Sequence, residues 1–173
     1  MYSTRTRLVL AVAALAFVPL YLSRGHLLGA LACMAAALLM FYGYRRYGTV
    51  WLATRALKSR DFEKAAALLA QVRSPATLSR QQRAYYELSM GTLALEGRNG
   101  TVADGHFRAA LSCGLRTEND RAVTEFSLAQ AAVLRDDESD ARSFLASARG
   151  RARKPALVAM INELQVLLDA EPA

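Results

Sequence analysis

The chain has 173 residues and a formal net charge of +7, with 22 Lys and Arg against 15 Asp and Glu. All 15 acidic residues lie at or after Asp61, so the excess positive charge belongs mainly to the two sides of an apolar N-terminal segment. This distribution indicates membrane topology and argues against a polyanionic ligand such as nucleic acid. Cys33 and Cys113 have no CxxC partner and no nearby His, which argues against a zinc site or a disulfide framework.

Two apolar runs occupy the N-terminal segment, Leu8–Leu22 and Leu27–Tyr44, and a short polar connection separates them. As a helix the second run would be about 27 Å long, close to the hydrocarbon core of a bilayer at about 30 Å. Helix is expected because backbone groups in lipid need hydrogen-bond partners within the segment. We therefore predict a transmembrane helical hairpin over residues 1–47, with helices at about 6–22 and 27–44.

The arginines predict the orientation of this hairpin. Arg5 and Arg7 precede it, several basic residues follow it, and Arg24 alone lies in the connection. The positive-inside rule then predicts a bacterial inner (plasma) membrane protein whose remaining residues, 48–173, lie in the cytoplasm. The alternative is that Leu8–Leu22 is the core of a signal peptide, which would place the remainder on the outer side of the membrane.

Residues 48–173 contain an internal repeat, whose step leads from Ala65 to Ala103 and again from Ala103 to Ala141. Six columns keep the size class of their side chains over three copies, in units at about 46–75, 79–114 and 118–150. The columns are Leu52, Met90 and Leu128; Ala53, Gly91 and Ala129; Ala56, Ala94 and Ala132; Ala65, Ala103 and Ala141; Leu69, Phe107 and Leu145; and Val72, Ala110 and Ala148. Small residues at fixed places let two helices approach closely, and large ones fill the space around them.

Each unit is predicted to contain a first helix and a second helix joined by a turn. The first helices are predicted at Tyr47–Ser59, Ser79–Glu96 and Glu118–Arg135, and the second helices at Phe62–Arg73, Thr101–Cys113 and Glu138–Arg149. After Pro155, apolar residues recur on one helical face, which predicts a C-terminal helix over residues 155–170 that caps the last unit. The alternative for this helix is a detachable, partner-binding segment.

The repeat resembles the tetratricopeptide repeat over about residues 46 to 150. In the first unit, Arg60–Ala65 stands where the family has Gly-Asp-Tyr-Asp-Glu-Ala, and in the second unit Gly91 takes the family's small-residue position. The A-x3-F-x2-A part of the signature is completed by Ala103, Phe107 and Ala110. Leu145 replaces the aromatic residue in the third unit, and the repeat step is longer than the family's by about one helical turn. The resemblance implies a three-unit α-solenoid with a C-terminal capping helix. Together with the transmembrane helical hairpin predicted from the apolar runs, this gives an all-α fold.

The sequence offers no catalytic constellation. Neither His26 nor His106 stands in an interpretable spacing with a nucleophile, so we predict no enzyme, no cofactor and no metal site. The acidic cluster over Asp136–Asp140 lacks the pattern of a calcium loop and is expected to cap a helix. The basic run Ala148–Pro155 is interpreted as a solvated connection; contact with acidic lipid, RNA or a partner's carboxylates is its alternative, and without interleaved aromatic residues nucleic acid is not expected.

The resemblance also implies that the first helices line a concave groove. At the positions where some members of the family clamp a peptide carboxylate, this chain carries no Lys or Asn. The candidate protein-binding residues form an apolar trough with hydroxyl and amide edges: Val50, Thr54, Leu57, Tyr85, Leu88, Thr92, Leu95, Val123, Phe126 and Gln130, with Val133 beyond them. Such a trough suits an amphipathic helix or an extended apolar segment, unless the C-terminal helix fills part of it.

We therefore expect a membrane-anchored protein–protein interaction scaffold that recruits a protein complex, or helps to assemble one, at the inner membrane. Its expected partners are a peptide or helix of another protein, subunits of a membrane complex, and membrane lipid. The alternative function is an accessory subunit that is bound mainly through its transmembrane hairpin. In that case the small residues of the second run would pack against other membrane helices: Gly29, Ala30, Ala32, Cys33 and Ala36.

Overall fold

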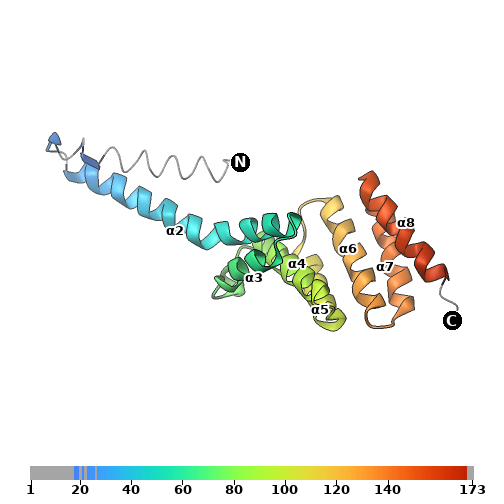
Figure 1. Ribbon diagram of the computed structural model, residues 1–173. Coiled ribbons are helices and arrows are strands. Elements are labelled where there is room, and N and C mark those ends of the chain that lie inside the picture. The colour runs from blue at the N-terminus through green and yellow to red at the C-terminus, as the bar shows by residue number, and fades with distance from the viewer. Residues whose placement is uncertain (1–17, 20, 22, 26, 171–173) are drawn as a thin grey trace. The chain divides into compact units, whose positions relative to one another are not determined.

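The computed structural model describes residues 18–19, 21, 23–25 and 27–170, and for residues 39–48 it describes the backbone only. The chain divides into two compact units, Met1–Trp51 and Leu52–Ala173. Every regular element among the described residues is helical, and none of them forms a strand (Figure 1). The prediction of an all-α, repeat-like fold is confirmed.

Helix α2, Leu27–Lys58, has 32 residues and is the longest of the described elements. It begins in the first unit, and its last turns, from Leu52 onward, belong to the second unit. In the first unit the ring of Tyr21 lies directly on this helix: a Cβ added to Gly29 would be 2.7 Å from Cδ1 of Tyr21. Any larger residue at Gly29 would therefore have to displace the ring.

The predicted transmembrane hairpin is wrong. Among the residues that the structure describes, no helix combines the length and the apolar character that crossing a bilayer requires. The run at 27–44 does not end as a separate helix, because α2 continues through Arg45 and Arg46 to Lys58. No proline interrupts this stretch, so nothing in the backbone chemistry stops the helix there. The other predicted membrane helix, at 6–22, lies outside the described residues except for three of its positions.

The second unit is built from antiparallel helices that follow one another along the chain (Figure 1). After the last turns of α2 come α3 (Phe62–Ala70), the short 3-10 helix η1 (Pro75–Thr77), α4 (Arg80–Glu96), α5 (Gly100–Cys113), α6 (Glu118–Val133), α7 (Glu138–Arg151) and α8 (Pro155–Ala170). The starts of the first helices α4 and α6 are separated by one repeat step, and so are the starts of the successive second helices α3, α5 and α7. The backbone therefore has the same period as the sequence.

The turn between the two helices of a repeat unit recurs in atomic detail. In each copy one residue with positive φ ends the first helix: Arg60 (59°), Arg98 (56°) and Asp136 (58°). The next amide donates to the carbonyl five residues earlier, as in the Schellman motif: Asp61 to Ala56, Asn99 to Ala94, and Asp137 to Ala132. Three equivalent turns with the same hydrogen bonds orient each second helix in the same way on its first helix.

The start of each second helix is also repeated. Asp61, Asn99 and Asp137 are the N-caps of α3, α5 and α7, and each side chain accepts a hydrogen bond from the amide three residues later. Short polar side chains at this position satisfy amides that have no partner inside the helix. These caps explain why the second helices start where they do, and they account for part of the acidic cluster noted above.

The interior of each repeat unit is made from paired small and large side chains. Phe107 of α5 is fully buried, and it lies so close to α4 that a Cβ added to Gly91 would be 2.6 Å from its ring. At the equivalent places in the next repeat unit, Ala129 of α6 and Leu145 of α7 are buried in one cluster. A larger residue on one helix thus accompanies a smaller one on the other, as close packing requires.

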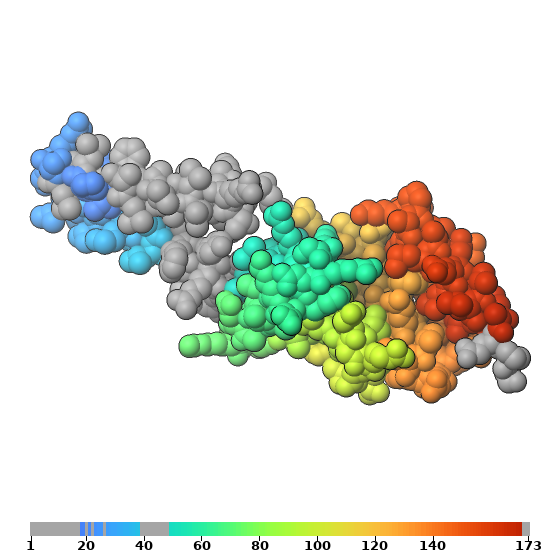
Figure 2. Space-filling view, in the orientation of Figure 1, coloured from blue at the N-terminus to red at the C-terminus, as the bar shows by residue number. Residues whose placement is uncertain are grey.

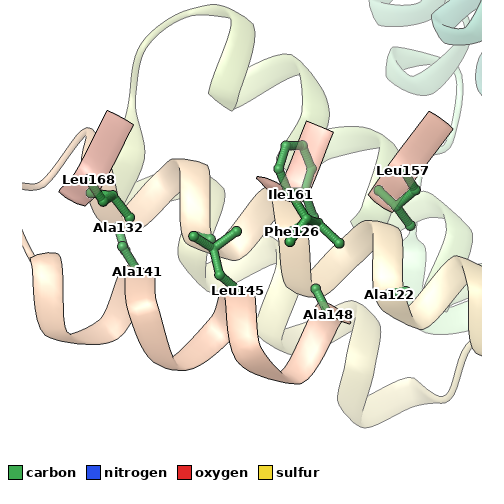
Figure 3. Packing of buried hydrophobic residues seen from close by; sticks show 10 residues of the cluster. Ala122, Phe126, Ala132, Ala141, Leu145, Ala148, Leu157, Ile161 and Leu168 are labelled. Carbon is green, nitrogen blue, oxygen red and sulfur yellow. The ribbon is translucent and has the colours of Figure 1, made fainter. Parts of the chain in front are cut away.

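Helix α8 completes the core at the end of the second unit. Its Leu157, Ile161 and Leu168 are buried in the same cluster as residues of α6 and α7, and Figure 3 shows Ile161 next to Phe126. An array of stacked helices leaves the side of its last pair uncovered, so a terminal helix in this place removes apolar surface from water.

Candidate interaction surface

The candidate groove residues lie on the first helices. Thr54 and Leu57 are in the last turns of α2, and Val50 is in the part of α2 that belongs to the first unit. The other seven lie on two helices, with Tyr85, Leu88, Thr92 and Leu95 on α4 and Val123, Phe126 and Gln130 on α6. Val50, Tyr85 and Phe126 are buried and the remaining seven are half-buried, as is Val133. The set therefore has no fully exposed member.

The part of the set that lies on α6 is largely covered by α8. Phe126 is 5% exposed and belongs to the cluster that Leu157 and Ile161 of α8 complete, and Val123 packs against the same cluster. Figure 3 shows the ring of Phe126 directed at the α8 side chains. At this end the apolar trough is filled by the chain's own C-terminal helix, so Phe126 stabilises the fold and is not available to a ligand.

The apolar residues on α4 are also partly engaged. Leu88 and Leu95 pack against a cluster that contains Phe107 of α5 and Leu128 of α6. Thr92 donates its hydroxyl hydrogen bond to the carbonyl oxygen of Leu88 at 2.8 Å, within its own helix. Leu88, Thr92 and Leu95 are each half-buried, so part of each residue remains exposed on α4.

Tyr85 joins the two first helices. Its hydroxyl donates a hydrogen bond of 2.6 Å to Oδ2 of Asp120, which lies on α6. Burial is the main cause that raises the pKa of Tyr85 to about 12, and the hydrogen bond and the negative charge of Asp120 add to the shift. The phenol is therefore neutral at physiological pH and holds α4 to α6.

Two buried carboxylates occupy equivalent positions on the first helices. Glu87 on α4 and Glu125 on α6 are one repeat step apart and are each 8% exposed. In both repeat units the second helix supplies a basic partner. Nδ1 of His106 is 2.8 Å from Glu87 Oε2, and Nε of Arg151 is 3.0 Å from Glu125 Oε1. Buried carboxylates need such partners, because an unpaired buried charge is strongly unfavourable.

The sequence interpretation missed these two contacts, although Glu87 and Glu125 keep the same register as the apolar columns. It also assigned the basic run at Ala148–Pro155 to solvent, whereas Arg151 bonds to Glu118 and to Glu125. Part of this run is therefore structural. The recurrence of a carboxylate at a fixed position of the repeat is the sequence feature that could have predicted the contacts of Glu87 and Glu125.

The remaining polar clusters are explained by the fold. The carboxylate of Asp137 accepts hydrogen bonds from the amide of Asp140 and the hydroxyl of Ser139, which lower the pKa of Asp137. Within the described residues, no group of three or more His, Cys, Asp or Glu side chains is arranged to hold a metal ion. Neither Cys33 nor Cys113 is in a disulfide.

These features define the chain as an all-α, repeat-like protein. No protein-family model matches the chain, and no curated protein sequence is similar to it. What the chain binds must therefore be argued from its own surfaces.

Proposed function

We propose that this chain is a non-catalytic helical-repeat scaffold of the tetratricopeptide type that binds a segment of another protein. The single observation that carries the proposal is the recurrence, at every repeat step, of one helical hairpin with the same turn and the same N-cap. A stacked array of this kind brings equivalent positions of successive first helices onto one extended surface, and such surfaces bind helices and extended peptides.

The polar column of the candidate groove is the part of this surface that supports binding best. Thr54, Thr92 and Gln130 take one position of the repeat and are all half-buried. In contrast, Phe126 is buried and half-buried Leu88 packs against the cluster around Phe107, so a charged substitution of either would also change stability. The proposed location at an inner membrane, on either side of it, and the contact with lipid remain proposals that do not depend on this surface.

Site-specific crosslinking in cells tests the groove. A photoreactive phenylalanine is introduced at Thr92 or at Gln130 of the full chain, and matched chains carry it at Ala146 and Gly105, which are exposed on the second helices α7 and α5. We expect a protein to crosslink at Thr92 and Gln130 at least about tenfold more efficiently than at the two control positions, because only the groove positions would face a bound segment.

Equal yields at all four positions, or no crosslinked protein at any of them, would remove the proposal. Circular dichroism of each purified variant establishes that the helices are intact. Thr92→Arg serves as the second test, because its larger cationic side chain would project into the groove and should abolish the crosslink at Gln130, whereas Gly105→Arg should leave it unchanged.

A further inference from the structure

Helix α8 carries apolar side chains on two sides. One side, with Leu157, Ile161 and Leu168, is buried in the core of the second unit. On the other side Met160, Val166 and Leu167 are 48%, 65% and 61% exposed, and the exposed alanines 156, 159 and 170 continue the same helical stripe. In Figure 2, α8 (red) forms one end of the second unit. The outer face of a terminal helix is normally polar, so this stripe needs an explanation.

The repeat register supplies the explanation. One repeat step from α6 carries the buried residues Ala122, Glu125, Leu128, Ala129 and Ala132 onto Met160, Glu163, Val166, Leu167 and Ala170 of α8. In α6 most of this face is covered by its own second helix: Ala122, Ala129 and Ala132 share a cluster with Ala141, Leu145 and Ala148 of α7. The exposed stripe of α8 is therefore equivalent to the face that a first helix uses to hold its second helix.

The carboxylate of Glu163 indicates that a helix docked on this face would carry a basic residue. Glu163 stands in the same column as Glu87 and Glu125. The nearest basic partners of those two carboxylates, His106 and Arg151, come from the second helix of each repeat unit, and Arg83 of α4 lies farther from Glu87, at 3.8 Å. Glu163 forms no ion pair with any residue that the structure describes, and the sequence of α8 contains no Lys, Arg or His. The face is thus an apolar stripe with one unpaired carboxylate at its centre.

We propose that the exposed face of α8, defined by Met160, Glu163, Val166 and Leu167, docks an amphipathic helix of another protein that takes the place of a second helix. This helix presents an apolar stripe to α8 and carries an Arg, Lys or His opposite Glu163. The second helices α5 and α7 each have 14 residues, so a segment of about this length suffices. The inference goes beyond the proposed groove, because it assigns a second surface that is tested independently.

A second copy of this chain fits the face less well. Glu163 lies midway between alanines 156 and 170, so a two-fold axis that pairs two α8 stripes would bring the two Glu163 carboxylates together. Neither stripe contains a base to compensate them, and like charges that meet in an apolar contact are repelled. The charge pattern therefore favours a different protein over self-association.

Crosslinking on the full chain tests the proposal. A photoreactive phenylalanine at Met160 is activated in the cells that produce the protein, and mass spectrometry maps the crosslinked segment. We expect the segment to lie in another protein, to have apolar residues at helical spacing, and to contain a basic residue beside them. Glu163→Lys should reduce the crosslink yield at least about tenfold, because it places two positive charges together.

The matched control is Asn162→Lys, which introduces the same charge at an exposed position on the polar side of α8. Asn162→Lys should leave the yield within about twofold. Restoration of the Glu163→Lys crosslink by an acidic residue in place of the partner's base would establish the charge pairing directly. Circular dichroism distinguishes loss of binding from loss of fold.

Three results would overturn the proposal: a crosslink from Met160 to a second copy of the chain, a crosslinked segment without a basic residue, or no crosslink. The positions Thr92 and Gln130 separate this outcome from that of the proposed function. A crosslink at those positions but not at Met160 removes the α8 site and leaves the groove. A crosslink at Met160 alone removes the groove and keeps the α8 site.

Discussion

The helical pairs α4–α5 and α6–α7 have the same period, the same turn and the same capping position, yet they fill their interiors differently. The first pair combines Gly91 with Phe107, and the second combines Ala129 with Leu145. The larger side chain in α5 is matched by the absence of a Cβ on α4. The repeat therefore keeps the combined volume of two facing positions and not the residue at either one.

The largest effect is expected from Gly91→Ala, because the new Cβ would be 2.6 Å from the ring of Phe107. The ring is fully buried and has no space to move into without disturbing its neighbours. We expect the free energy of unfolding, measured by urea denaturation, to fall by about 1–3 kcal/mol.

Two controls define the cause of that loss. Phe107→Leu in the Gly91→Ala background recreates the combination found in the second pair and should recover most of the lost stability. Gly105→Ala, where an added Cβ meets nothing within 4 Å, should instead stabilise α5 by about 0.5–1 kcal/mol. If Phe107→Leu gives no recovery, the matched-volume explanation is wrong.

A second difference is the contact between Tyr85 and Asp120, since Val123 takes the position of Tyr85 in the next unit. Burial and Asp120 raise the pKa of Tyr85 from 10.0 to about 12, so folding favours the neutral phenol. Its contribution to stability is complete below about pH 10 and is lost as the pH rises through about 12.

Unfolding measured from pH 9 to 12 therefore tests this contact. The parent chain should lose about 1–2 kcal/mol more over this range than Tyr85→Phe, which has no proton to release. Asp120→Asn should show an intermediate dependence, because it keeps an acceptor but removes the charge. Parallel pH profiles for the parent chain and Tyr85→Phe would show that the phenol does not hold the two helices together in its neutral form.

The smallest effect is expected at the turns, which the two pairs share. Arg98 and Asp136 adopt positive φ, where a side chain is strained and glycine is not. Arg98→Gly should raise the free energy of unfolding by about 0.5–1 kcal/mol, and Asp136→Gly by less, since Asp tolerates this conformation better. Gly114→Ala, at φ of 87°, should have the opposite sign. Destabilisation by Arg98→Gly would exclude backbone strain at this turn.

Much of the second unit follows from local patterns. The helices α4 to α8 have bounds within two residues of those predicted, because the columns of small and large residues and the capping cluster at Asp136–Asp140 are read directly from the chain. The state of the candidate groove could not be predicted from the sequence in the same way. Whether Phe126 lines a trough or lies under α8 depends on how a helix much later in the chain packs against it.

The N-terminal segment shows how composition can mislead. An apolar run of membrane-spanning length predicts a separate helix, but α2 continues to Lys58 because nothing in its sequence breaks the helix. The paired carboxylates illustrate the opposite error. Glu87 and Glu125 look like surface residues of amphipathic helices, and their burial becomes visible only when His106 and Arg151 are placed beside them.

Local interactions along the chain set the repeat step, the helical pairs and their approximate bounds, because turn geometry, capping and side-chain volume act over a few neighbouring positions. Which apolar faces are covered depends instead on how distant helices pack against one another. Leu157 and Leu167 both lie on α8 and are both apolar, yet one is 6% exposed and the other 61%. Burial depends on the element that packs against a face, and that element is chosen by contacts between distant parts of the chain.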